Sequence, residues 1–94
     1  MSHDIRNDTS RNRYVLSVDG TEVGYLSYIP FTGAIDLEHT SIAESHAGQG
    51  LVGVLARHAL DDIRARGFKA MVTCPAVESF VAKNPDYADL VVEP

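Results

Sequence analysis

The first half of the chain alternates apolar and polar residues in three stretches separated by turn signals. Alternation with a period of two is typical of strands that bury one face. Asp19-Gly20 is a strong hairpin signal, because both residues tolerate positive φ, and Pro30 and Gly33 bracket a second turn. The pattern therefore predicts three antiparallel strands over residues 13–18, 22–29 and 34–42.

The third stretch has two faces of different character. One face carries Ile35 and Leu37 and extends to His39, and the other carries Asp36, Glu38 and Thr40. Regular alternation thus predicts that His39 lies on the same side of the strand as two apolar side chains.

The twelve residues before the first stretch show no such periodicity. We therefore expect residues 1–12 to form a flexible N-terminal arm and residues 13–94 to form one domain. A chain of 94 residues, 45% of them hydrophobic, has room for one core and not for two.

The period of the apolar residues changes from two to nearly four after Gly50. This spacing predicts an amphipathic helix with one face against the sheet. Gly67 is placed to end the helix in a left-handed conformation, after cations in the last turn. The apolar positions that define the helical face are Leu51, Leu55, Ala59 and Ile63.

A short apolar run, residues 68–73, predicts a buried strand that a right-handed crossover places parallel to the third strand. Pro75 suits the first turn of a final helix that ends before Asn84-Pro85, and residues 90–92 are a candidate edge strand. The expected fold is therefore α/β (α+β), a compact mixed sheet in which three antiparallel strands are followed by a parallel crossover. The order is strand, strand, strand, helix, strand, helix.

Composition excludes several classes of partner. The net charge of -5 argues against nucleic acid, because phosphate backbones are bound mainly by clustered Lys and Arg. No apolar run approaches the roughly 20 residues of a membrane span. Cys74 is the only cysteine, so the chain has neither a disulfide framework nor a cysteine-based zinc pattern. We expect a cytoplasmic protein with no metal and no membrane partner.

The turn that leads into the long helix contains Gly48 and Gly50. Glycines let the backbone approach a ligand closely, and the first turn of a helix presents N–H groups without partners inside the helix. Such a turn stabilises an anion, and a pyrophosphate fits it. A short connector whose glycines serve packing alone is the alternative, and these residues by themselves leave both open.

Two other phosphate motifs fit less well. A Walker loop needs a Lys that does not follow Gly50. The dinucleotide pattern G-x-G-x-x-G is met by Gly48, Gly50 and Gly53, but it follows a hairpin meander rather than a strand-helix-strand unit. We therefore rank a nucleotide-binding fragment as the less favoured interpretation of this turn.

The stretch from Tyr14 to Val92 resembles the short, single-domain branch of the GNAT N-acetyltransferase superfamily, sometimes called YjdJ-type. No single motif would establish this resemblance, but the order and spacing of seven short motifs together are specific. The motifs that carry the resemblance are Val18-Asp-Gly, Gly24-Tyr-Leu-Ser-Tyr, Leu37-Glu-His-Thr, Ala47-Gly-Gln-Gly-Leu, Leu60-Asp-Asp-Ile-Arg, Cys74-Pro and Asn84-Pro-Asp-Tyr.

The resemblance implies binding of acetyl-CoA, with the pantetheine arm beside the third strand and the pyrophosphate on the turn before the long helix. In the family's motif Gln/Arg-x-x-Gly-x-Gly/Ala, this chain has Ala47 in place of the cationic or amide residue and Val52 in place of the small one. A second register over residues 45–50 also loses the first residue but keeps the same glycines at the phosphates. The implied cofactor contacts are Thr40, Ser41, Ile42, Ala47, Gly48, Gln49, Gly50, Leu51 and Val52.

Acyl transfer from a thioester to an amine needs a deprotonated amine, a polarised carbonyl and a proton for the departing thiolate. Glu38 and His39 are candidate bases near the end of the third strand, with a solvated strand face and a structural hydrogen bond as the respective alternatives. Cys74 has three candidate roles: it takes the acetyl group, it protonates the thiolate, or it fills a small buried space.

Four further residues are secondary candidates. His46 and Arg57 are placed to contact the cofactor's phosphates, and Phe80 and Lys83 to border its cleft. Packing or solvation is the alternative for each.

These features together predict an acetyl-CoA-dependent N-acetyltransferase that transfers acetyl by direct attack to an unidentified amine, either of a small molecule or of a protein. The alternative is a non-catalytic acyl-CoA-binding or protein-interaction module, because the chain lacks the first two helices that build much of the acceptor site in larger enzymes of the superfamily. We expect a monomer or a weak homodimer.

Overall fold

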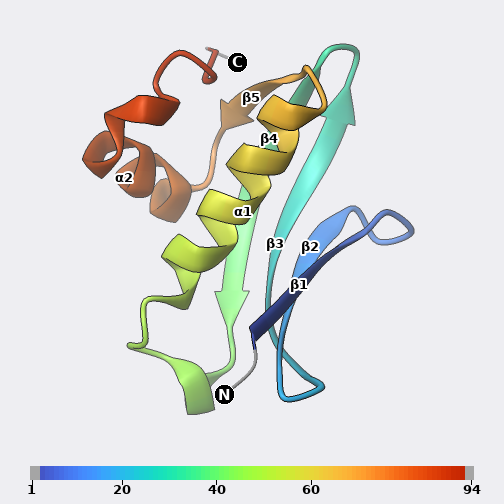
Figure 1. Ribbon diagram of the computed structural model, residues 1–94, viewed down its shortest axis with the longest axis vertical. Coiled ribbons are helices and arrows are strands. Elements are labelled where there is room, and N and C mark those ends of the chain that lie inside the picture. Colours follow the sequence, from blue (N-terminus) through green and yellow to red (C-terminus); the bar gives the residue numbers. More distant parts are fainter. Residues whose placement is uncertain (1–2, 93–94) are drawn as a thin grey trace.

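The computed structural model describes residues 3–92 and contains one five-stranded sheet in the order β1-β2-β3-β4-β5 (Figure 1). The first four strands are antiparallel to their neighbours, and β5 is parallel to β4. The mixed sheet and its parallel crossover confirm the expected fold class. The strands are β1 (His3–Asp8), β2 (Arg13–Val18), β3 (Thr21–Phe31), β4 (Ala34–Ile42) and β5 (Lys69–Val72).

Two helices and two short 3-10 turns complete the fold. Helix α1 (Leu51–Ala65) connects β4 to β5, and Gly67 follows it with a φ of 78°, so the predicted left-handed end is confirmed. Helix α2 (Pro75–Lys83) starts at the predicted proline. The 3-10 turns are η1 (Glu44–His46) and η2 (Pro85–Tyr87). The candidate edge strand at residues 90–92 is present only as one parallel bridge, between Ala70 and Val91.

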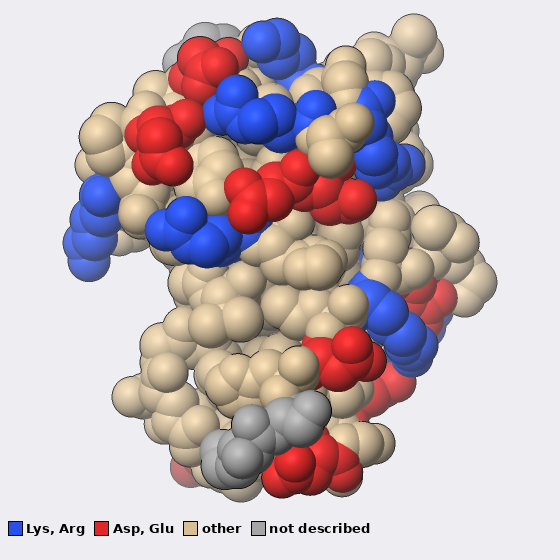
Figure 2. Space-filling view, in the orientation of Figure 1, with Lys and Arg blue, Asp and Glu red and all other residues tan. Residues whose placement is uncertain are grey.

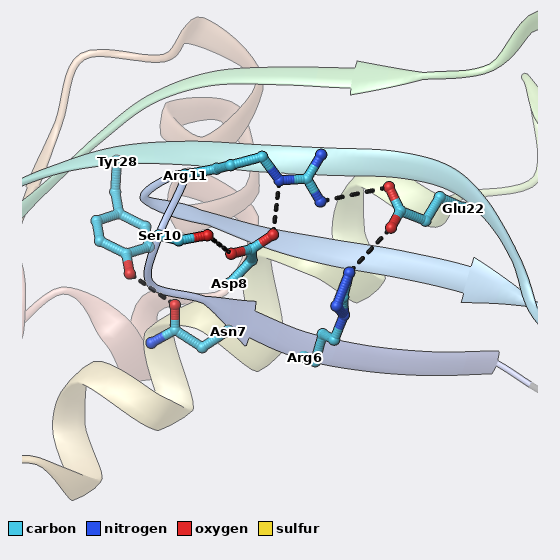
Figure 3. Close-up of polar contacts among 7 residues, drawn as sticks. All are labelled: Arg6, Asn7, Asp8, Ser10, Arg11, Glu22 and Tyr28. Carbon is cyan, nitrogen blue, oxygen red and sulfur yellow. Dashed lines mark hydrogen bonds and ion pairs between the residues drawn. The ribbon is translucent and has the colours of Figure 1, made fainter.

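The expectation of a flexible arm at residues 1–12 is wrong for residues 3–8, which form β1; residues 1 and 2 lie outside the described part of the chain. β1 pairs with β2 over six residue pairs. Side chains add to this ladder, because Tyr28 donates a hydrogen bond of 2.6 Å to Asn7 and Arg6 lies 2.9 Å from Glu22 (Figure 3). Backbone pairing and polar contacts hold the strand, so it needs no apolar alternation.

The turn between β1 and β2 is organised around Asp8. Its carboxylate accepts hydrogen bonds from the Ser10 hydroxyl at 2.7 Å and from Arg11 Nε at 2.6 Å (Figure 3). These two bonds lower the pKa of Asp8 from 3.8 to about 2. The ionised carboxylate is thus the form that stabilises this turn.

One hydrophobic core lies between the sheet and the helices, and both α1 and α2 contribute to it. Tyr14 reaches across this core from β2, and its hydroxyl donates a 2.7 Å hydrogen bond to Asp62 on α1. Burial, together with this bond, raises the pKa of Tyr14, so the hydroxyl stays a neutral donor. The largest fully buried side chains are Tyr14, Leu16, Leu26, Leu37, Leu55, Leu60, Ile63 and Val77.

A β-bulge interrupts β4 at Glu38. On β3 the consecutive residues Ser27 and Tyr28 face His39 and Leu37, so Glu38 is the extra residue. Consecutive strand residues point to opposite faces, and His39 therefore lies on the face opposite to Leu37. Leu37 is fully buried and His39 is exposed. The prediction that they share a face is wrong, because regular alternation fails at a bulge.

We predict that the turn at Asp8 loses stability in acid. A carboxyl whose folded pKa is lowered stabilises the fold above its unfolded pKa and loses that contribution as the pH falls through the folded value. The unfolding midpoint of the unaltered protein, followed by circular dichroism, should therefore exceed that of Asp8→Asn above pH 4, and the gap should close towards pH 2. A gap of constant size across this window would contradict the assignment.

Candidate functional site

The parallel pairing of β4 and β5 ends at Leu37, and the two chains part there. Four residue pairs join the strands, from Ala34 with Lys69 to Leu37 with Val72. The Leu37 carbonyl then accepts hydrogen bonds from two amides, those of Thr73 and Cys74, both at 3.1 Å. Beyond this point the chain turns away into α2 while β4 continues to Ile42 (Figure 1).

The last five residues of β4 therefore have a strand partner on one side only. Four of them pair with β3, from His39 with Ser27 to Ile42 with Gly24, and Glu38 is the unpaired residue of the bulge. No strand among residues 3–92 pairs with the other edge of this segment. Backbone groups along this edge are free to bond an extended ligand. The side chains of Thr40, Ser41 and Ile42 are half-buried.

The glycine turn is open to solvent. Gly48 and Gly50 have φ values of 79° and 73°, which favour glycine, and a Cβ on either would meet nothing within 4 Å. Ala47 and Gln49 are also exposed. No side chain of the described residues therefore closes the approach to this turn.

Helix α1 begins at this turn without a side-chain cap. Gly50 is the N-cap residue, and the first helical hydrogen bond runs from Val54 N–H to the Gly50 carbonyl at 3.4 Å. The N–H groups of Leu51, Val52 and Gly53 have no acceptor within residues 3–92. Because the helix dipole adds partial positive charge at this end, the helix start is suited to an anion.

The expected cofactor residues thus form one continuous path. It runs along the unpaired edge of β4, through η1 and the glycine turn, and into the first turn of α1 (Figure 1). The path offers backbone groups for an extended chain and uncapped amides for a phosphate, in that order.

The three catalytic candidates do not form one cluster. Cys74 is 3% exposed, and its Sγ lies 3.7 Å from the Thr40 hydroxyl. Its thiol therefore contacts β4 just beyond the end of the β4–β5 pairing. Glu38 is exposed in the bulge, next to the Leu37 carbonyl that Cys74 also contacts. His39 lies on the opposite face, with its ring centroid 6.0 Å from that of Tyr25.

Arg57 makes several contacts within the protein, and its candidate contact with the cofactor stays a prediction. Its guanidinium donates to the Tyr87 hydroxyl at 3.2 Å and to Asn84 Oδ1 at 3.0 Å, and it lies 5.4 Å from the Phe80 ring. Tyr87 in turn donates a 2.6 Å hydrogen bond to Asp61. This network holds α2 and η2 against α1, so the Asn84-Pro-Asp-Tyr motif is explained by packing.

Two of the other secondary candidates, His46 and Phe80, lie at the path. His46 is half-buried in η1, with Nδ1 2.9 Å from the Ser45 hydroxyl, and Phe80 packs 3.6 Å from the position of a Cβ on Gly53. Lys83 is exposed at the end of α2. Within residues 3–92, no group of three or more His, Cys, Asp or Glu side chains is placed to hold a metal ion.

The family model for GCN5-related N-acetyltransferases matches residues 13–90. The chain belongs to this family. The match covers strands β2 to β5, both helices and the whole path described above, but not β1. The expected superfamily is confirmed, whereas the short single-domain branch stays a prediction. The protein is therefore classed as an acetyltransferase.

Curated relatives of this acetyltransferase include Protein NATD1 of Bos taurus, which is 28% identical over 83 residues. That alignment covers 86% of this chain and 74% of the relative. Protein NATD1 of Homo sapiens is 26% identical over the same number of residues, with the same coverage.

Solved structures support the fold. A GCN5-like putative N-acetyltransferase from Staphylococcus aureus has a TM-score of 0.71 at 17% identity, over 97% of this chain and 89% of that one. A ribosomal-protein-alanine N-acetyltransferase from Brucella melitensis biovar Abortus 2308 has a TM-score of 0.58 at 20% identity. The alignment with this second structure covers 87% of the chain described here and 62% of the Brucella chain. No helix of residues 3–92 is long and apolar enough to cross a membrane.

We predict that Tyr87→Phe lowers the free energy of unfolding by about 1–2 kcal/mol, because the buried hydroxyl makes one bond to Arg57 and one to Asp61. Urea unfolding measures the change. Tyr25→Phe is the matched control, since no hydrogen bond of the Tyr25 hydroxyl is found within residues 3–92. Equal effects of the two substitutions would show that the network contributes nothing.

Proposed function

We propose that this chain is an acetyl-CoA-dependent N-acetyltransferase that transfers the acetyl group to an amine by direct attack. The observation that carries the proposal is the unpaired edge of β4 running directly into an uncapped helix start. Family membership supports the reaction class, and the open path supports the cofactor.

The residues of the path fit the cofactor's chemistry. A diphosphate needs donors and positive potential, and the uncapped amides of Leu51, Val52 and Gly53 supply both despite the acidic charge of the whole chain. In the view of Figure 2, charged side chains gather over the end of α1 and over α2 rather than over the start of α1. Ala47 brings no polar side chain to this turn, so binding depends on backbone amides. Thr40, Ser41 and Ile42 would hold the pantetheine arm through the free backbone edge. When bound, acetyl-CoA supplies the activated acetyl group as a thioester.

The chain's own groups then serve the transfer. The amine nitrogen forms a bond to the acetyl carbonyl carbon, the carbon–sulfur bond breaks, and the amine loses one proton while the thiolate gains one. Glu38 in the bulge and His39 on the opposite face are the candidate acceptors of the amine's proton. Backbone N–H groups at the end of β4 polarise the carbonyl oxygen. Cys74 is the candidate proton donor to the thiolate, or the residue that takes the acetyl group first.

Two further expectations belong to this proposal. We infer a monomer or weak homodimer, with acetyl-CoA and an amine as the partners rather than nucleic acid or membrane. A cytoplasmic location stays a prediction.

Calorimetric titration with CoA tests the cofactor site. Gly50→Glu should weaken binding by at least ~100-fold, because it places a bulky anion beside the amides proposed for the phosphates. Gly33→Glu is the matched control, since Gly33 has a similar φ of 75° and equally open surroundings but lies in the turn between β3 and β4. The control should bind CoA like the unaltered protein. Retained affinity in Gly50→Glu would mean that the cofactor site is elsewhere.

Incubation with labelled acetyl-CoA tests the chemistry. Direct attack predicts label on an added amine and none on the protein, and Cys74→Ser should then keep part of the activity. Label recovered on Cys74, and lost in Cys74→Ser, would instead establish a covalent route. Tight CoA binding without label on any amine or on the protein would favour the non-catalytic module and reject the enzyme proposal.

A further inference from the structure

The sheet has one face that no helix of residues 3–92 covers. Both helices belong to the core on the other face. Val15 is only 3% exposed and yet lies outside that core cluster, because its side chain belongs to this second face. This second face carries His39, one of the two candidate bases.

Strand register fixes which side chains are neighbours on this face. Arg13, Ser27 and His39 form one row across β2, β3 and β4, and Val15, Tyr25 and Ser41 form the next. The Arg13 guanidinium carbon lies 3.9 Å from the centre of the Tyr25 ring, and that ring is 6.0 Å from the His39 ring. A line of side chains thus leads from Arg13 to the bulge.

A pocket of about 200 Å³ opens on this face. Its lining includes Arg13, Val15, Glu22, Tyr25 and Ser41. Whole-ligand sites typically measure about 300–1,000 Å³, so this pocket suits one end of a small molecule rather than a cofactor.

The charges around the pocket leave one cation available. Arg6 and Arg11 both contact the Glu22 carboxylate, at 2.9 and 3.5 Å, and Arg11 also binds Asp8 (Figure 3). Arg13 has no ion pair within residues 3–92, and its Nε is buried without a hydrogen-bond partner there. Among these three arginines, Arg13 is therefore the one whose guanidinium pairs with no carboxylate of residues 3–92. A buried donor without an acceptor also costs free energy that a ligand oxygen would recover.

Building on the proposed function, we propose that this pocket binds a carboxylate of the acceptor, so that the enzyme prefers amines that carry one. The carboxylate accepts hydrogen bonds from Arg13 and Ser41, and the aliphatic chain of the acceptor lies along Tyr25 toward the bulge. Strands are about 4.8 Å apart, so the two strand spacings between Arg13 and His39 set an amine-to-carboxylate span of up to about 10 Å. A linear amino acid such as 6-aminohexanoate fits within this span, whereas hexylamine lacks the anionic end.

Nuclear magnetic resonance tests the pocket without any need for turnover. The Arg13 Nε–H signal should shift on titration with 6-aminohexanoate and not with hexylamine, because only the former brings an acceptor for this donor. In Arg13→Gln, the amide signal of Ser41, which lines the same pocket, should no longer shift on titration with 6-aminohexanoate. Arg11→Gln is the matched control, since Arg11 lies near the same face but is already paired with Asp8 and Glu22. An Arg13 signal that ignores 6-aminohexanoate, or follows both compounds equally, would overturn the proposal.

Turnover with acetyl-CoA gives the second readout. The kcat/KM for 6-aminohexanoate should exceed that for hexylamine by ~10-fold or more, and this ratio should fall to about one in Arg13→Gln but persist in Arg11→Gln. A ratio near one in the unaltered protein would reject the carboxylate preference even if both amines are acetylated. Absence of acetylation of either amine, with a shifted Arg13 signal, would reject the proposed function and keep the pocket.

Discussion

The structure depends on the point at which two parallel strands separate. The Leu37 carbonyl ends the ladder by accepting two amide hydrogen bonds, from Thr73 and Cys74, and β4 acquires a bulge at the next residue. The bulge reverses the faces of the β4 residues that follow it. The two hydrogen bonds to the Leu37 carbonyl mark the point at which the chain leaves the ladder for α2. Every proposed contact of the cofactor lies on the part of β4 that this separation exposes, on the glycine turn, or on the helix start that follows the turn.

The sequence predicted the elements that follow simple periodicity. β4 has the expected bounds. α1 lies between Gly50 and Gly67, the two glycines that predict its start and its end. The two failures, β1 and the face of His39, have one cause. β1 is held by its ladder with β2, and the face of His39 is set by the extra residue in the pairing of β4 with β3. Neither kind of strand pairing leaves a local pattern of apolar residues in the sequence.

Part of the geometry of the candidate site also follows from the sequence, whereas its role in binding stays a prediction. A glycine turn before a long helix indicates where an anion binds, and the structure leaves Gly48 and Gly50 open. The role of Arg57 was not predictable, because its partners Asn84 and Tyr87 lie far along the chain. The row from Arg13 to His39 was also hidden, because it joins three strands whose register depends on two bulges, the one at Glu38 and a second one at Val23 of β3.

β1 closes the sheet at its outer edge, and its composition bears on how the molecule behaves in a crowded solution. An edge strand exposes unpaired backbone groups that another chain can extend, and charged side chains are a common defence against such association. β1 has the sequence His-Asp-Ile-Arg-Asn-Asp, with three charged residues in six. Ile5 is the single apolar residue of β1, and the polar and charged composition that concealed this strand from pattern analysis therefore also protects the protein from edge-to-edge aggregation.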